Sequence, residues 1–181
     1  MRIVKAAEKD YPRLAEIWAS AVLATHSFLP PDYFEQIREN LCPAYFPGVD
    51  QLLMALDGDG RPQAFIGLVA PKPQRGNASP RIDGDLNGAA GNGLNGPAAL
   101  EESPARVEML FVDAASFGRG YGRALIEKAG DLYGSLELEV NEQNPGGRAF
   151  YEKMGFKVTE RFETDGEGKP YPLLRMLRRQ T

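Results

Sequence analysis

The chain has 181 residues, 43% of them hydrophobic, which is enough for one globular domain with a full core and too few for two. Its formal net charge of −4 argues against a nucleic-acid partner, because phosphate binding needs clustered Lys and Arg. The sequence has no run of about 18 apolar residues, so we expect no membrane partner and a cytoplasmic protein. The lone Cys42 is consistent with a reducing compartment.

The first half of the chain alternates strand-like and helix-like segments. Residues 2–6 are predicted to form a strand, and apolar residues at helical spacing after Asp10 predict a helix capped by that residue. Prolines end this helix, and a second one is expected over about 32–41. Residues 51–56 and 63–70 are predicted to be strands joined by the turn DGDGRP.

Residues 71–105 differ in composition from the rest. They hold six Gly and five Pro and no aromatic residue, so they cannot bury enough apolar surface to offset chain entropy. We interpret them as a flexible surface insertion between the third and fourth strands of a single domain spanning 1–181. A linker between two domains is the less favoured interpretation.

The second half returns to regular patterns. In order, the segments predicted are a strand at 106–112, a helix from about 117 to 132 with a buried stripe of Leu125, Ile126, Ala129 and Leu132, a strand at 136–140, a short helix, and strands at 156–164 and 173–177. Asn144 is a good N-cap for the short helix, with Pro145 at its first position and Gly155 after its end. The fold class is therefore mixed α/β.

A glycine turn joins the 106–112 strand to the following helix. Gly118, Gly120 and Gly122 recur at every second residue, and positions without Cβ atoms let an anion approach backbone N–H groups. A helix N-terminus has unpaired N–H groups and partial positive charge, which favours a phosphate or pyrophosphate. Arg119 and Arg123 add fixed positive charge.

Several nucleotide-binding folds share such a strand, turn and helix. This turn is not a Walker loop, because Arg123 and Ala124 follow Gly122 where that motif has Lys and Ser or Thr. A dinucleotide-binding domain is the closer alternative, since Glu139 lies about 20 residues after the glycine turn, where such domains have an acidic residue that binds the ribose. The spacing is nevertheless G-x-G-x-G rather than G-x-G-x-x-G.

The stretch NEQNPGGRAFYEKMGF favours a third possibility. Asn144 and Tyr151 are seven residues apart and so lie on one face of the short helix. Together with LFVDAASFGRGYGRAL, this stretch strongly resembles the GNAT superfamily of acetyl-CoA-dependent N-acetyltransferases. The resemblance covers 2–70 and 106–177, and it implies the GNAT fold, acetyl-CoA as cosubstrate without a metal, and direct acetyl transfer to a primary amine of a small molecule or a lysine side chain.

The resemblance also implies particular cofactor contacts. The glycine turn would hold the coenzyme A pyrophosphate, the Asn would contact the pantetheine arm, and the Tyr would face the sulfur. The residues implied are Leu110, Phe111, Val112, Phe117, Gly118, Arg119, Gly120, Tyr121, Gly122, Arg123, Asn144 and Tyr151. Phe117 departs from the family pattern, which has Arg or Gln there. This departure keeps a non-catalytic acyl-CoA sensor as an alternative function.

Acetyl transfer to an amine requires proton removal from the acceptor and stabilisation of the leaving sulfur. An amine of pKa about 10.4 must lose a proton, and a thiolate of pKa about 8.5 must be stabilised as it leaves. Tyr151 is our candidate for the sulfur, with Glu108 and His26 as candidate bases for the amine. The pieces ATHSFL and GKPYPLL resemble a bacterial branch of the superfamily, and by the same resemblance a homodimer is possible.

Overall fold

A computed structural model describes residues 1–71 and 103–180 of the chain. Its main elements follow the predicted order of strands and helices, which is thereby confirmed. They are β1 (Arg2–Lys5), α1 (Tyr11–Thr25), α2 (Pro31–Asn40), β2 (Gln51–Leu56), β3 (Pro62–Val69), β4 (Ala105–Val112), α3 (Tyr121–Tyr133), β5 (Leu136–Asn141), α4 (Pro145–Lys153), β6 (Lys157–Phe162) and β7 (Leu173–Arg178).

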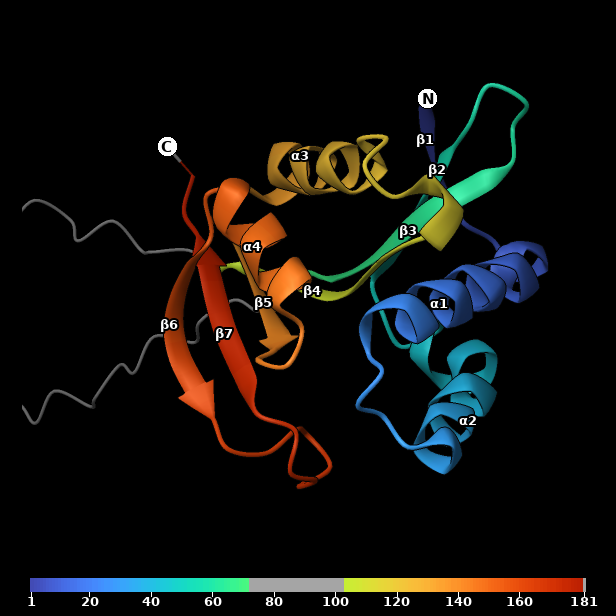
Figure 1. The fold of residues 1–181 in the computed structure, drawn as a ribbon. Coiled ribbons are helices and arrows are strands. Elements are labelled where there is room, and N and C mark those ends of the chain that lie inside the picture. Colours follow the sequence, from blue (N-terminus) through green and yellow to red (C-terminus); the bar gives the residue numbers. More distant parts are fainter. Residues whose placement is uncertain (72–102, 181) are drawn as a thin grey trace, which may run out of the picture.

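One sheet of seven strands organises the domain, in the order β1-β2-β3-β4-β5-β7-β6. All neighbours are antiparallel except β4 and β5, which are parallel. Figure 1 shows α3 and α4 on one side of the sheet and α1 and α2 on the other. Each pair of helices buries its own apolar cluster, built on Leu125 and Ile126 under α3 and on Leu14 and Ile17 under α1.

Three local predictions are corrected by the structure. The helix expected from about 117 begins only at Tyr121, because Gly118 and Gly120 adopt left-handed φ angles of 75° and 86°. Leu132, predicted to be in the buried stripe, is 42% exposed. Asp10 makes no side-chain hydrogen bond to α1; its Oδ2 instead accepts one from the Ala7 amide at 2.9 Å.

The predicted insertion is only partly within the described residues. Residues 72–102 lie outside them. Ala105, predicted to be the last residue of the insertion, is instead the first residue of β4. It pairs with Leu136 of β5 and is fully buried in the α3-side cluster. The single domain and the flexible insertion remain predictions.

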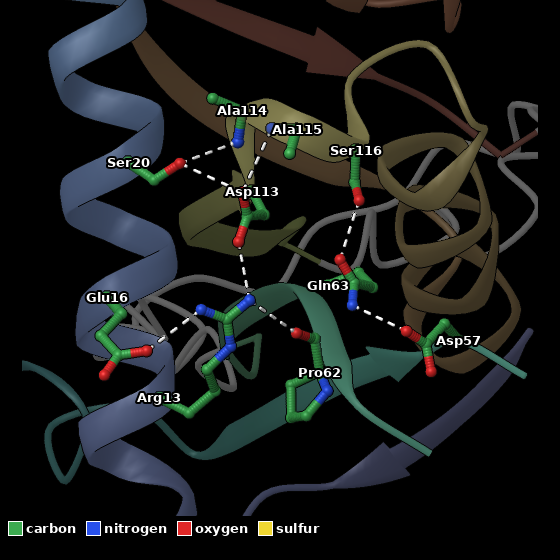
Figure 2. A network of polar contacts seen from close by, with 10 residues as sticks. All are labelled: Arg13, Glu16, Ser20, Asp57, Pro62, Gln63, Asp113, Ala114, Ala115 and Ser116. Carbon is green, nitrogen blue, oxygen red and sulfur yellow. Dashed lines mark hydrogen bonds and ion pairs between the residues drawn. The ribbon is translucent and has the colours of Figure 1, made fainter. Parts of the chain in front are cut away.

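A polar network holds the end of β4 against α1 (Figure 2). Asp113 follows β4 directly, and one of its oxygens accepts a hydrogen bond from Arg13 Nη2 at 2.7 Å. Its other oxygen accepts from Ser20 Oγ at 3.2 Å and from the Ala115 amide at 3.1 Å. Burial opposes ionisation of this carboxyl, but these hydrogen bonds outweigh it and keep the pKa of Asp113 below its ordinary value.

Asp113→Asn is therefore expected to lower the free energy of unfolding by about 1–3 kcal/mol at pH 7, because hydrogen bonds to a charged group are lost. A group with a lowered folded-state pKa stabilises above its ordinary pKa and loses that contribution as the pH falls. The deficit should begin to shrink below about pH 4, where Asp113 of the unfolded chain takes up a proton, and it should disappear below the lowered pKa of folded Asp113. Urea unfolding from pH 3 to 7 measures this.

Glu16→Gln is the matched control, because Glu16 is the other ion-pair partner of Arg13 and its side chain is 69% exposed. That variant should lose no more than about 0.5 kcal/mol. A deficit in Asp113→Asn that stays constant down to pH 3 would show that the charge of Asp113 is not what stabilises the network.

Candidate active site

The parallel strands β4 and β5 separate partway along their length. They pair only from Ala105 with Leu136 to Val107 with Leu138, whereas β5 continues to pair with β7 as far as Asn141. The rest of β4, from 108 to 112, therefore has β3 on one edge and no strand on the other. This divergence produces an opening in the middle of the sheet.

A β-bulge lies where the opening begins. Gly67 of β3 pairs with Met109 and Leu68 pairs with Val107, so Glu108 is an extra residue on β4. Val107 and Leu110 both pack on the α3 side, which leaves Glu108 and Met109 together on the α1 side. Alternation after Val107 puts the predicted base Glu108 on the face of the sheet opposite α3 and α4, and the bulge puts Met109 beside it on the same face.

Backbone amides line the free edge of β4. The Asp113 amide donates to Gln63 of β3 at 2.8 Å. Because successive N–H groups of an extended strand point to opposite edges, the amides of Val112 and Leu110 point away from β3, into the opening. Two of the predicted cofactor contacts are thus available as hydrogen-bond donors.

The glycine turn lies at the end of the same strand. Cβ atoms built on Gly118 or Gly120 would meet nothing within 4 Å, so the turn presents bare backbone to open space. The amides of Tyr121, Gly122 and Arg123 begin α3 and have no intrahelical partner. Bare backbone and unpaired helix N-terminal amides are what an anion site needs, and the pyrophosphate site stays a prediction.

Gly122 also has a packing function that the sequence did not reveal. A Cβ there would approach the Phe150 ring to 3.3 Å and Val112 to 3.5 Å, so the glycine lets α3 lie close to α4 and β4. Phe117 is 45% exposed beside the turn, and Arg119 and Arg123 are exposed as well.

Gly120→Ala is expected to raise the dissociation constant for acetyl-CoA about tenfold, equivalent to about 1.4 kcal/mol. A side chain disfavours the left-handed conformation, and the added methyl group would project into the space that the turn leaves free. Isothermal titration calorimetry measures the change.

Gly60→Ala is the matched control, because Gly60 has a φ of 81° and equally open surroundings in the β2–β3 turn. Both variants should lose similar stability, but only Gly120→Ala should lose affinity. Equal affinities for the two would exclude the glycine turn as an anion site.

Tyr151 lies on the α3 side of the sheet. Its ring contacts those of Phe150 and Phe156, with centroids 5.2 and 5.7 Å away, and packs against the α3-side cluster. Burial raises the pKa of the Tyr151 phenol above its ordinary value. The hydroxyl therefore stays protonated at neutral pH and remains a hydrogen-bond donor, as stabilisation of a thiolate requires.

Asn144 caps α4, and its Oδ1 accepts a hydrogen bond from the Gly147 amide at 2.9 Å. The capping prediction is confirmed. Because Oδ1 is already engaged, any contact from this side chain to a ligand would come mainly from its Nδ2 group.

Alternating charges connect Glu108 to the last strands. Arg106 pairs with Glu108 at 2.9 Å and with Glu139 of β5 at 3.2 Å. Glu139 also pairs with Arg175 of β7 at 2.9 Å, and Arg175 pairs with Glu160 of β6 at 2.7 Å. The predicted base is thus held in a network of ion pairs on the face opposite α3.

His26 belongs to a different group of side chains, beside the β6–β7 loop. Its ring lies 5.3 Å from that of Phe28, which lies 5.9 Å from Tyr171; Tyr171 in turn stacks on Tyr33 at 5.7 Å. The Tyr33 hydroxyl donates to Asp165 at 2.8 Å. The pieces ATHSFL and GKPYPLL therefore meet in space. Sequence reasoning quoted Phe28 within ATHSFL without giving it a role, and it missed Tyr33, which lies in no distinctive motif.

Burial lowers the pKa of the His26 imidazole, so it is neutral at pH 7, and its Nδ1 lies 2.7 Å from Thr25 Oγ1. His26 also lines a cavity of about 460 Å³ between α1 and α2, with Phe34 and Arg38 among its other lining residues. No residue of β4, β5 or α4 lines this cavity. The structure therefore does not bring His26 together with Glu108 or Tyr151.

The described residues contain neither a candidate metal site nor a candidate membrane-spanning helix. Within residues 1–71 and 103–180, no group of three or more His, Cys, Asp or Glu side chains could hold a metal ion. Within the same ranges, no helix is both long and apolar enough to cross a membrane.

Comparisons with known proteins agree with this geometry. A family model described as an acetyltransferase (GNAT) domain matches residues 83–158. The peptidyl-lysine N-acetyltransferase YjaB of Escherichia coli is 31% identical over 174 residues, covering 96% of this chain and 94% of that protein. The solution structure of apo YjaB from Escherichia coli has a TM-score of 0.72 and 29% identity, and the alignment covers 99% of this chain and 98% of that one.

A crystal structure of the PaiA N-acetyltransferase from Thermoplasma acidophilum in complex with coenzyme A shares the fold. Its TM-score is 0.66 at 21% identity, with 98% of each chain covered. The chain belongs to the GNAT superfamily of N-acetyltransferases. It is an enzyme that transfers an acetyl group to an amine, and the superfamily's donor is acetyl-CoA.

Proposed function

We propose that this enzyme acetylates lysine side chains of peptides or proteins, with acetyl-CoA as the donor. The observation that supports this most is the similarity, over nearly the whole chain, to an enzyme named as a peptidyl-lysine N-acetyltransferase. An acceptor face on which Glu108 is exposed also suits a long, cationic side chain.

The coenzyme side of the site would be formed by β4, the glycine turn and α4. The turn from Gly118 to Arg123 would hold the pyrophosphate through backbone amides and the flanking arginines. The amides of Leu110 and Val112 would bind the pantetheine arm and the thioester carbonyl. Acetyl-CoA supplies an activated acyl group, and Tyr151 would donate a hydrogen bond to its sulfur as the C–S bond breaks.

The acceptor side would be the opposite face of the sheet. Glu108 would remove the amine proton, directly or through water, so that the nitrogen lone pair is free to attack. His26, which is neutral at pH 7 but lies with the aromatic residues beside the β6–β7 loop, would contact the acceptor away from the reacting nitrogen. The cytoplasmic location and the homodimer stay predictions.

The test is release of free thiol from acetyl-CoA across lysine peptides, polyamines, aminoglycosides and amino acids, with mass spectrometry of the product. We expect Nε-acetyl-lysine, and no reaction with the same peptide carrying norleucine in place of lysine. Turnover with small amines but not with peptides would contradict the lysine proposal. Binding of acetyl-CoA without turnover on any amine would indicate the sensor.

A further inference from the structure

Asn141, the last residue of β5, has a buried oxygen with no partner. Among the described residues, its Oδ1 is the one buried side-chain nitrogen or oxygen atom that makes no hydrogen bond. Buried polar atoms nearly always have a partner, and an unpaired one is costly. A side chain that keeps such an atom next to an active site points to a ligand that completes it.

The strand pattern places Asn141 on the acceptor side. Leu138 and Val140 are buried under α3, so the period of two puts Glu139 and Asn141 on the opposite face, together with Glu108. On one edge Asn141 pairs with Leu173 of β7, whereas β4 has already diverged on the other. Asn141 therefore lies beside the opening in the sheet.

We propose that Asn141 Oδ1 accepts a hydrogen bond from the nitrogen of the acceptor amine and positions it for attack. This inference rests on the proposed function. An amide oxygen only accepts hydrogen bonds, so its partner must donate one. A primary amine has two N–H groups left after it loses a proton, whereas the thioester has none. The N–H groups of the pantetheine arm are the other source of the same chemistry.

Glu108, Asn141 and Tyr151 would each act on a different bond of the reaction. Glu108 takes the proton that the ammonium loses, and Asn141 holds one of the remaining N–H bonds, so that the lone pair points into the opening. The N–C bond then forms, the nitrogen loses one of its two remaining protons to solvent, and the C–S bond breaks. The sulfur leaves as a thiolate on the Tyr151 side. Asn141 is a positioning residue, and its loss should affect acceptor binding before it affects the coenzyme.

Asn141→Leu removes the oxygen while it keeps the branching at Cγ and the number of heavy atoms. We expect the KM for a lysine peptide to rise about tenfold, as for loss of one buried hydrogen bond. The dissociation constant for acetyl-CoA should stay within about twofold. The Tm of the free protein should be unchanged or higher, because leucine needs no partner. A purely structural asparagine would give a lower Tm.

Two further variants sharpen the test. Asn141→Asp keeps an acceptor oxygen and should retain most of the wild-type activity. Glu137→Leu is the matched control on the same face of β5, where β4 and β5 are still paired, and its kinetics should be those of the wild type.

An unchanged peptide KM in Asn141→Leu would overturn the inference. So would a selective loss of acetyl-CoA affinity, which assigns the oxygen to the pantetheine arm, or equal losses in the Leu and Asp variants, which assign the function to the amide N–H. Should wild type acetylate only small amines, the lysine proposal fails. The same comparisons with the best small amine would still decide the role of Asn141.

Discussion

Tyr151→Phe is expected to lower kcat by 10²- to 10⁴-fold, the range in which a single proton-handling group contributes. The phenol lies in a buried aromatic setting that raises its pKa, so it remains a donor across the working pH range. Phenylalanine keeps the ring contacts with Phe150 and Phe156 and removes only the hydroxyl. The KM for both substrates should change little. Steady-state release of free thiol measures the loss.

Tyr133→Phe is the matched control. Tyr133 also packs against the α3-side cluster, but its hydroxyl accepts a hydrogen bond from Gln51 Nε2 at 2.9 Å, away from the opening. Its kcat should be that of the wild type. A fall of less than about threefold in Tyr151→Phe would show that the sulfur needs no proton donor from this residue.

Glu108→Gln is expected to lower kcat/KM for a lysine acceptor by about 10²-fold at pH 7, where almost all of the amine is protonated. Below pH 10.4, each unit of pH raises the free-base fraction of the amine about tenfold. The deficit relative to the wild type should therefore shrink towards pH 9.5, because the acceptor then needs less help to lose its proton. A pH–rate profile of both proteins measures this.

Glu137→Gln is the control, because Glu137 lies on β5 where the two parallel strands are still paired. It should follow the wild-type profile. A deficit in Glu108→Gln that is constant from pH 6.5 to 9.5 would mean that Glu108 orients the acceptor or Arg106 rather than removing a proton.

Local patterns were sufficient to predict the elements that we propose hold the coenzyme. The glycine turn and the Asn144 cap are encoded within a few residues, and the structure places both where the sequence predicted. The start of α3 was wrong by about four residues, because the pattern does not show that two left-handed glycines delay the helix. Leu132 shows that periodicity overestimates burial near a helix end.

The proposed acceptor side could not be predicted from local patterns. The bulge at Glu108 depends on the register between β3 and β4, and the opening depends on how far β4 follows β5. Asn141 lies within the motif NEQNPGGRAFYEKMGF, and the alternation of Leu138 and Val140 could have placed it on the face of the sheet opposite α3. Nothing local indicates that its oxygen lacks a partner.

The separation of β4 from β5 has a kinetic consequence. If donor and acceptor reach the reacting carbon from opposite faces of one sheet, neither needs to leave before the other arrives, and both occupy the enzyme at once. Initial-rate plots for the two substrates should then intersect rather than run parallel. Free coenzyme A should compete with acetyl-CoA but not with the amine, so accumulated product would slow the enzyme whatever the amount of acceptor.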